Sequence, residues 1–155
     1  VIENLSEGHT TQIHHRFGLE HNEHGFSKIE KQPSGGELYE RRINGELHSP
    51  DNNTPSRKLI NYKEVSSYCT GEEYHKNGDL HRDDDLPAVI THTKLYGGDE
   101  DKQEYYKNGL LHREGDKPAI IINTIKPNGQ SIKIERYYKN GKLTRENGLP
   151  HTITT

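Results

Sequence analysis

The stretch that decides the fold is Glu104-Tyr105-Tyr106-Lys107-Asn108-Gly109-Leu110-Leu111-His112-Arg113. Asn-Gly supplies the two residues with positive φ that a type I′ turn needs, and this turn is preferred in two-residue β-hairpins. Because the turn fixes the register, we expect Tyr106 to face Leu111 and Glu104 to face Arg113. The stretch therefore predicts a β-hairpin with an aromatic–aliphatic pair and an ion pair across it.

The same pattern occurs four times along the chain. Its glycines, Gly45, Gly78, Gly109 and Gly141, stand 33, 31 and 32 residues apart. A proline follows each hairpin and is expected to end the second strand, because proline cannot donate to a β-ladder. The apolar runs after the proline, such as 88–90 and 119–125, predict a further strand. A fixed period of this length is the signature of a repeat architecture.

The predicted fold is all-β: an elongated antiparallel β-meander of about four 32-residue hairpin repeats with an atypical N-terminal cap. Residues 37–155 are expected to form the four tandem β-hairpin repeats as one continuous domain. Residues 1–36 contain the pair His15-Arg16 but no Asn-Gly. We interpret them as a degenerate N-terminal repeat that caps the sheet, since terminal repeats are usually atypical.

The charge pairing predicted across the hairpins is not uniform. In the second copy Glu73 is expected to face Arg82, as Glu104 faces Arg113 in the third. In the fourth copy Arg136 would face Arg145, so the opposite charges are lost there.

Composition supports a thin sheet rather than a thick core. Of 155 residues, 27% are hydrophobic and 29% are charged, while the net charge is only −3. Alanine, the best helix former, occurs twice, and 15 Gly and 7 Pro favour turns. The near-neutral charge gives no sign of a general nucleic-acid surface.

Several features predict a cytoplasmic protein. The single Cys69 cannot form an internal disulfide, which favours a reducing compartment. The chain has no apolar run long enough to span a membrane and no signal peptide. Val1 is small enough to follow a removed initiator Met. We therefore expect a complete cytoplasmic protein, in the host cytoplasm if its source is viral.

The run Tyr137-Tyr138-Lys139-Asn140-Gly141-Lys142-Leu143 resembles the signature of MORN-type repeats, particularly their variant form. The longer pattern Tyr-Tyr-Lys-Asn-Gly-x-Leu-His-Arg followed by Pro-Ala is similar to repeats in bacteriophage and giant-virus proteins. The resemblance covers about residues 37–155, although the unit here is longer than a MORN unit. It implies an elongated antiparallel sheet that contacts other proteins. It also implies an antitoxin-like or phage-type inhibitor of a bacterial defence or toxin protein.

The favoured function is a non-catalytic protein-binding repeat module. Exposed Tyr and Arg side chains are the expected hot spots, because these residues dominate many interfaces. The candidate binding residues belong to the repeated hairpins: Tyr74, His81, Arg82, Tyr105, Tyr106, His112, Arg113, Tyr137 and Tyr138.

Two other functions stay open on the sequence. The pairs His81-Arg82 and His112-Arg113 suit a protein that sequesters a nucleotide or another small molecule, because Arg matches phosphate geometry. A His beside such an Arg could also act as a general acid or base in a nuclease or phosphodiesterase. Against an enzyme, the sequence holds no phosphate loop and no HExxH or GxSxG motif.

Metal binding is a minor alternative, and no cofactor is predicted. His48, His81 and His112 recur once per repeat. Three strands at ~4.8 Å spacing would place them ~14 Å apart, too far to share one ion. The other histidine cluster consists of the weak metal candidates His14, His15, His21 and His24.

The expected partner is a host or toxin protein, whose identity the sequence does not reveal. A nucleotide is a possible ligand, nucleic acid is disfavoured and no membrane is involved. The open edges of such a sheet also allow a homo-oligomer. The acidic runs 83–85 and 99–101 are interpreted as solvated turns rather than as mimics of nucleic acid.

Overall fold

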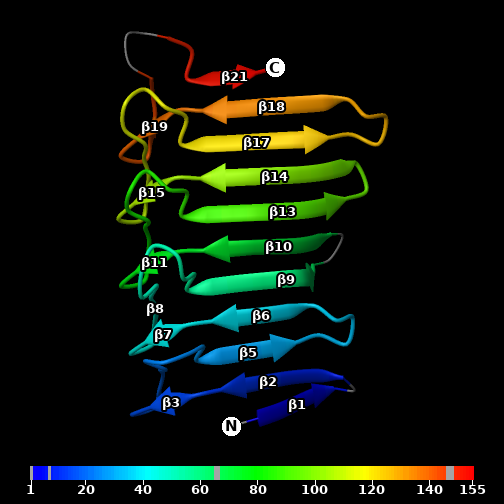
Figure 1. Cartoon of the computed structure of the whole chain (residues 1–155), viewed down its shortest axis with the longest axis vertical. Helices are drawn as coiled ribbons and strands as arrows, with labels where there is room; N and C mark the ends of the chain where they lie inside the picture. Colours follow the sequence, from blue (N-terminus) through cyan, green and yellow to red (C-terminus); the bar gives the residue numbers. More distant parts are fainter. Residues whose placement is uncertain (1, 7, 65–66, 146–148) are drawn as a thin grey trace.

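The computed structural model describes residues 2–6, 8–64, 67–145 and 149–155, and all of their regular structure is β. Eleven strands form one antiparallel sheet. Each of them pairs with the next strand of this sheet in chain order, and the short hairpin strands between them are left out of it (Figure 1). This confirms the predicted elongated β-meander. None of the described residues belongs to a helix long and apolar enough to cross a membrane. The sheet strands are β1 Ile2–Ser6, β2 His9–Ile13, β5 Lys28–Lys31, β6 Glu37–Glu40, β9 Arg57–Lys63, β10 Tyr68–Glu73, β13 Val89–Leu95, β14 Gly98–Glu104, β17 Ile120–Ile125, β18 Ser131–Arg136 and β21 Thr152–Thr154.

Five two-stranded hairpins stand in a column along one side of this sheet, on the left in Figure 1. We call them the hairpin column. Each hairpin lies in the chain between two strands of the sheet, so one repeat contributes two sheet strands and one hairpin. The hairpins pair β3 His15–Arg16 with β4 Leu19–Glu20, β7 Arg42–Ile43 with β8 Glu46–Leu47, β11 His75–Lys76 with β12 Asp79–Leu80, β15 Tyr106–Lys107 with β16 Leu110–Leu111, and β19 Tyr138–Lys139 with β20 Lys142–Leu143.

The Asn-Gly turns are confirmed. Asn108 has a φ of 50° and Gly109 a φ of 75°, and the other three copies have the same backbone. Tyr106 pairs with Leu111 as predicted. Two residues with positive φ match the right-handed twist of the flanking strands, which explains why the same dipeptide returns in each of these turns.

The predicted ion pairs across the hairpins are wrong. The ladder of each hairpin is only two residue pairs long, because the chain leaves the sheet at the residue before the hairpin. The Tyr105 N–H donates to Ala119 O at 2.8 Å, while Glu104 stays in β14 opposite Val89 and Ile120. Glu104 therefore does not face Arg113. In the same way Glu73 pairs with Arg57 at 2.9 Å instead of Arg82, and Arg145 pairs with Asp116 at 3.1 Å rather than facing Arg136.

The N-terminal segment contains a fifth hairpin of the same kind. Phe17 and Gly18 form its turn, with φ values of 52° and 80°. His15-Arg16 precedes this turn and corresponds to His75-Lys76, not to the His-Arg pair that follows the other turns. No Asn-Gly marks this hairpin in the sequence, because Phe17 stands where the other turns have Asn.

Burial concentrates where the sheet meets the hairpin column. Ala88 and Ala119 are fully buried there, next to the buried strand starts Val89 and Ile120. A smaller cluster within the sheet consists of Leu38, Leu59 and Cys69, with Tyr62 packed against it. No second layer covers the sheet in the part of the chain that the structure describes (Figure 1). The junction and the stacked hairpins therefore supply most of the packing.

Candidate functional site: the hairpin column

Each of the four Asn-Gly turns is hydrogen-bonded to the hairpin before it. The Gly109 N–H donates to Leu80 O at 2.9 Å, and the Asn108 N–H donates to His81 Nδ1 at 3.0 Å. The same glycine contact joins the other hairpins at 2.8–2.9 Å, and the same histidine contact is made by His21, His48 and His112. We call this set of contacts the histidine ladder. It requires an imidazole whose Nδ1 carries no proton.

The other ring nitrogen of His21, His81 and His112 meets an acid two residues further on, whereas Pro50 stands at that place after His48. His81 Nε2 lies 2.9 Å from Asp83, and His112 Nε2 lies 2.8 Å from Glu114. These hydrogen bonds hold the pKa values of Asp83 and Glu114 below their ordinary range. Each of these three imidazoles thus donates to its acid and accepts from the next turn. In the last hairpin, β19–β20, Thr144 stands at the position of the ladder histidine. No further hairpin follows among the described residues, so no later turn needs an acceptor there.

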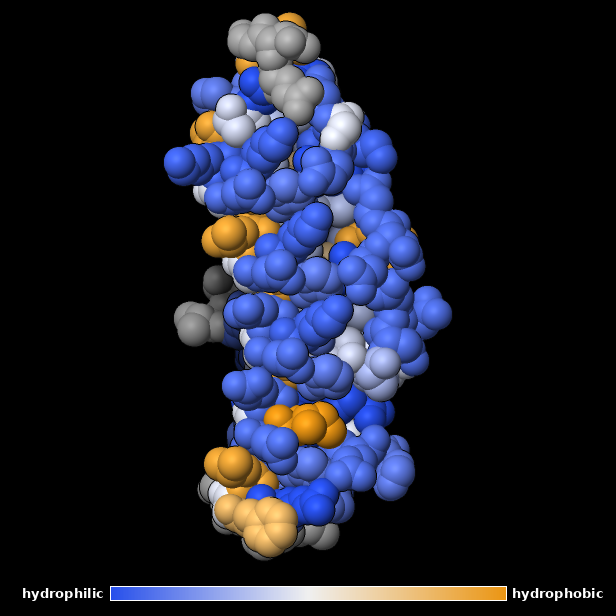
Figure 2. Space-filling model, turned by 90° about the vertical axis from the view of Figure 1, so that its left-hand side faces the viewer, coloured by the Kyte–Doolittle hydropathy of each residue, from blue (hydrophilic) through white to orange (hydrophobic). Residues whose placement is uncertain are grey.

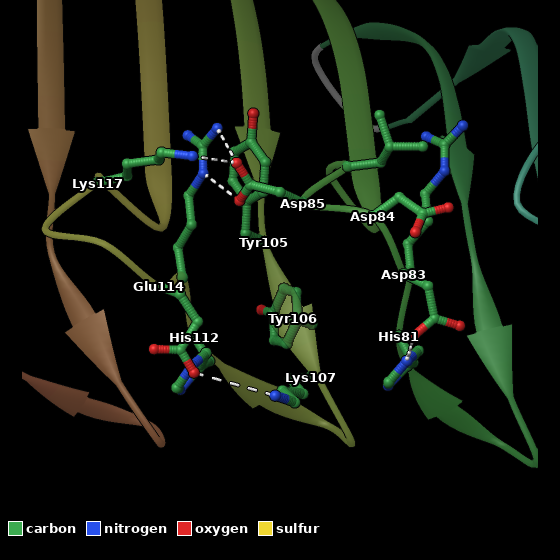
Figure 3. A pocket seen from close by; sticks show the side chains of 13 residues that line it. His81, Asp83, Asp84, Asp85, Tyr105, Tyr106, Lys107, His112, Glu114 and Lys117 are labelled. Atoms are coloured by element: carbon green, nitrogen blue, oxygen red, sulfur yellow. Dashed lines mark hydrogen bonds and ion pairs between the residues drawn. The ribbon is translucent and has the colours of Figure 1, made fainter.

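In each of the last three repeats an arginine side chain stacks on a tyrosine ring. The Arg113 guanidinium lies 3.6 Å from the centroid of the Tyr105 ring, and its Nη1 donates to Pro118 O at 3.2 Å. Its Nε donates to Asp85, in the loop of the preceding repeat, at 2.8 Å, and Lys117 reaches the same carboxylate at 2.7 Å (Figure 3). The hydrogen bond from Arg113 lowers the pKa of Asp85. We call this arrangement the arginine clamp.

The clamp recurs with small changes. Arg82 lies 3.6 Å from the Tyr74 ring and Arg145 lies 4.0 Å from the Tyr137 ring. Arg82 donates to Asn52 O at 2.8 Å, where the next two clamps have Asp85 and Asp116. The arginines thus tie each hairpin to the loop of the preceding repeat.

The structure brings all nine predicted binding residues into the hairpin column and its junction with the sheet, but most of them are engaged in the scaffold. Tyr74, Tyr105 and Tyr137 are only 3%, 7% and 6% exposed, so their rings are not available to a partner. Tyr106 and Tyr138 are half-buried. His81 and His112 belong to the histidine ladder, and Arg82 and Arg113 belong to the arginine clamps.

Hollows lie along the column beside the three contacts between consecutive Asn-Gly repeats. The hollow between the second and third Asn-Gly repeats has a volume of about 240 Å³ and is lined by residues of the 83–86 loop and of the β15–β16 hairpin (Figure 3). Similar hollows lie beside the neighbouring repeats. Exposed ion pairs stand at their rims: Lys107–Glu114 and Lys76–Asp83, each at 4.0 Å, and Arg16–Glu23 at 2.7 Å.

Sequence reasoning missed a buried serine–histidine pair. Ser56 Oγ lies 2.8 Å from His75 Nδ1, and Glu73 lies 3.9 Å from His75 Nε2. The residue types are those of a hydrolase triad, but Ser56 is fully buried and no substrate carbonyl could reach its hydroxyl. Ala88 and Ala119 take the place of Ser56 in the next two repeats, and Tyr takes the place of His75. The pair therefore fills a packing position.

Cys69 is also unsuited to act as a catalytic nucleophile. It is buried in the sheet, and burial raises the pKa of its thiol. A thiol with a raised pKa is a poor nucleophile at neutral pH.

The four weak metal candidates do not form a coordination site. His14, His15, His21 and His24 line one open hollow of about 380 Å³. Yet the described residues contain no group of three or more His, Cys, Asp or Glu side chains placed to hold a metal ion. His21 also accepts the Asn44 N–H at 3.1 Å as part of the histidine ladder.

The predicted ~14 Å spacing of His48, His81 and His112 needs correction. Each repeat places two strands in the sheet, not three, so equivalent positions recur every ~10 Å. This is still too far for a shared ion.

Comparisons of this chain with protein-family models, with curated proteins and with solved structures find no match.

The histidine ladder makes a prediction for stability. Replacing His112 with Ala is expected to lower the free energy of unfolding by about 1–3 kcal/mol, because the Asn140 N–H loses its acceptor. His92 is the control: it is half-buried and pairs with the exposed Asp101, so His92→Ala should change stability by less than about 0.5 kcal/mol. Urea unfolding followed by circular dichroism measures both, and equal effects would contradict a structural role of His112.

The buried His75 makes a prediction for pH. Burial lowers the pKa of His75 below its ordinary value of 6.5, against the opposing effect of Glu73. Between the lowered value and 6.5 the unfolded chain binds more protons than the folded one, so stability should fall as the pH drops below 6.5. Because the pKa values of Asp83 and Asp85 are also lowered, a second loss is expected as the pH falls below 3.8.

A double variant separates the two losses. Ser56→Ala with His75→Tyr copies the Ala88 and Tyr106 pair of the next repeat. It should reduce the dependence of stability on pH between pH 6.5 and the carboxylate range and keep the loss at lower pH. Thermal unfolding measured across this range tests the assignment, and an unchanged profile would refute it.

Proposed function

We propose that this chain is a non-catalytic protein-binding repeat module that docks its partner on the hairpin column. The observation that carries this proposal is that two groups of side chains on the column have different roles. The groups with potential chemistry, His81, His112, Arg82 and Arg113, hold consecutive repeats together. Large apolar side chains that the fold does not bury remain exposed on the same column and its loops: Phe17, Leu19, Leu86, Leu110 and Leu143.

The surface of the column suits a protein partner. Viewed from this side, it shows isolated apolar patches within a mostly polar surface (Figure 2). Exposed apolar side chains surrounded by polar ones are the usual anatomy of a non-obligate interface. The hollows and ion pairs at the repeat contacts add shape and polar specificity.

The type of partner follows from the sequence resemblance described above. A repeat protein of the MORN-variant or phage type would act as an inhibitor of a bacterial defence or toxin protein in the cytoplasm. Neutralisation by a long, preorganised surface needs no catalytic group, and rigidity reduces the entropy lost on binding.

The two rival functions find less support. A nucleotide-binding protein would need free cations, but Arg113 and Lys117 both pair with Asp85, and Asp83, Asp84 and Glu114 line the same hollow. A nuclease or phosphodiesterase would need a free general base beside a substrate. The Nδ1 of His81 and of His112 accepts a backbone hydrogen bond, and the Nε2 faces an acid.

The test is a binding measurement with surface variants. A partner that co-purifies with the wild-type chain should bind Leu110→Asp/Leu143→Asp at least about tenfold more weakly, a loss of about 1.4 kcal/mol. Ile125→Asp is the control, because Ile125 is also exposed but ends β17 away from the column (Figure 1). Heat release on titration with nucleotides, or turnover of nucleic acid that His81→Ala and His112→Ala abolish, would favour the rival functions instead.

A further inference from the structure

Phe17 is the one residue at the stacked turns whose backbone and side chain are mismatched. Its φ is 52°, and the corresponding residues of the other four turns are Asn44, Asn77, Asn108 and Asn140, with φ of 50–52°. Asn tolerates this left-handed conformation, whereas for a bulky side chain it is a genuine outlier. The first turn therefore carries backbone strain that Asn would relieve.

Within the part of the chain that the structure describes, little packing offsets this strain. The Phe17 side chain is 93% exposed. Its ring meets Arg16, whose guanidinium lies 5.4 Å from the ring centroid and is itself exposed. A strained residue that contributes nothing to the fold points to a role outside it.

The surroundings of Phe17 extend the apolar surface. Leu19, on the other strand of the same hairpin, is also exposed and lies against the next turn at Gly45. Ile43 stands at the hairpin position where three later repeats have Lys76, Lys107 and Lys139. Apolar surface gathers at this end of the column, at the bottom of Figure 2. We call Phe17, Leu19 and Ile43 the Phe17 patch.

Charge at the edge of the patch is balanced within the chain. Arg16 pairs with Glu23 at 2.7 Å, and His21 faces the same carboxylate at 3.2 Å. Arg42 pairs with Glu20 at 3.2 Å. The patch therefore does not select a strongly charged surface, and what it can recognise is an apolar one.

We infer that Phe17 is the anchor residue of the interface: its ring inserts into an uncharged apolar pocket of a folded partner protein, with Leu19 and Ile43 packing at the pocket's rim. The inference rests on the proposed function. A large aromatic side chain that enters a desolvated pocket is the typical hot spot of a protein interface. The strained turn already holds the Phe17 ring away from the column. The ring therefore loses little conformational entropy when the partner binds.

The decisive variant is Phe17→Asn, which gives the first turn the residue of the other four. It should raise the melting temperature by about 2–4 °C, because the strain disappears and no packing is lost. The same variant should weaken partner binding by at least about 30-fold. This opposite response of stability and affinity is the signature of an anchor that the fold itself does not need.

The matched control is Tyr96→Asn. Tyr96 is also a fully exposed aromatic residue at a turn between two strands, but its φ is not in the left-handed region. It should change neither the melting temperature nor the affinity. The partner is obtained by photo-crosslinking from a benzophenone amino acid at position 17, with position 110 as a second site, and its affinity is then measured with the purified protein.

Each outcome decides the inference. A lower or unchanged melting temperature for Phe17→Asn overturns it, because Phe17 would then have a structural role. Equal affinity of wild type and variant overturns it and leaves the proposed function to the Leu110→Asp/Leu143→Asp test. Crosslinks from position 110 without crosslinks from position 17 would also overturn the inference, while the proposed function would still depend on the leucine variants. Phe17-dependent binding to phosphatidylcholine–phosphatidylglycerol vesicles, or Phe17-dependent dimerisation in sedimentation, overturns it in favour of a lipid surface or a second copy.

Discussion

Replacing Tyr105 with Ala is expected to lower the free energy of unfolding by about 3–5 kcal/mol, the usual cost of truncating a buried aromatic side chain. Tyr105 is buried where the sheet meets the hairpin column, and the Arg113 guanidinium stacks on its ring at 3.6 Å. Removing the ring opens a cavity and also leaves Arg113 without its platform. Chemical unfolding in urea, followed by far-UV circular dichroism, measures the loss.

The control for Tyr105 is the exposed Tyr96. Tyr96→Ala should alter stability by less than about 0.5 kcal/mol, as expected for a surface substitution. A double-mutant cycle with Arg113→Ala should give a coupling of about 0.5–2 kcal/mol, the range for a cation–π contact from an exposed to a desolvated site. If Tyr105→Ala proved as mild as Tyr96→Ala, the arginine clamp would not hold the repeats together.

The hairpins could be predicted because their cause is local. Asn-Gly determines the turn from two residues, and the turn determines that Tyr106 meets Leu111. The strand after each proline was also predictable, since β13 and β17 begin at the apolar runs that follow Pro87 and Pro118.

The contacts beyond the two residue pairs of each hairpin ladder could not be predicted in the same way. Extending the hairpin register to Glu104 and Arg113 assumed a continuous ladder, but the chain bends at Tyr105 and returns Glu104 to the sheet. The partner of Arg113 is Asp85, which is 28 residues away and belongs to the preceding repeat. Pairing between repeats depends on how hairpins stack, and no pattern within one repeat specifies this.

The sequence identified residues that the fold brings near one another, but it did not predict the contacts that they make. All nine proposed binding residues lie in the column or at its junction with the sheet, yet the identity of a residue does not tell which face it occupies. Tyr105 and Tyr106 are neighbours of the same type, and only the first is buried beneath an arginine. Conversely, the sequence gives no signal for Phe17, because the other four turns have Asn at its position.

Two neighbouring glycines at the β13–β14 turn should respond to alanine in opposite directions. Gly98 has a φ of 130°, in the region that favours glycine, and a Cβ there would overlap the carbonyl oxygen of Ile125 on the next strand. Gly98→Ala is therefore expected to cost about 2–6 kcal/mol, the sum of backbone strain and overpacking. Gly97 has open space and no such φ, so Gly97→Ala should stabilise the fold by about 0.4–1 kcal/mol by restricting the unfolded chain.

The contrast tests how closely the sheet strands pack. The Ile125 carbonyl is backbone, so it cannot move aside as a flexible side chain would without disturbing the pairing of Asp99 with Ile125. Urea unfolding of the two variants at one pH gives both signs in the same experiment. If Gly98→Ala were tolerated as well as Gly97→Ala, β14 and β17 could not approach as closely as the structure places them. The pairing of the sheet strands would then have to be reconsidered. Because these strands set the spacing of the repeats, the stacking of the hairpins would be affected as well.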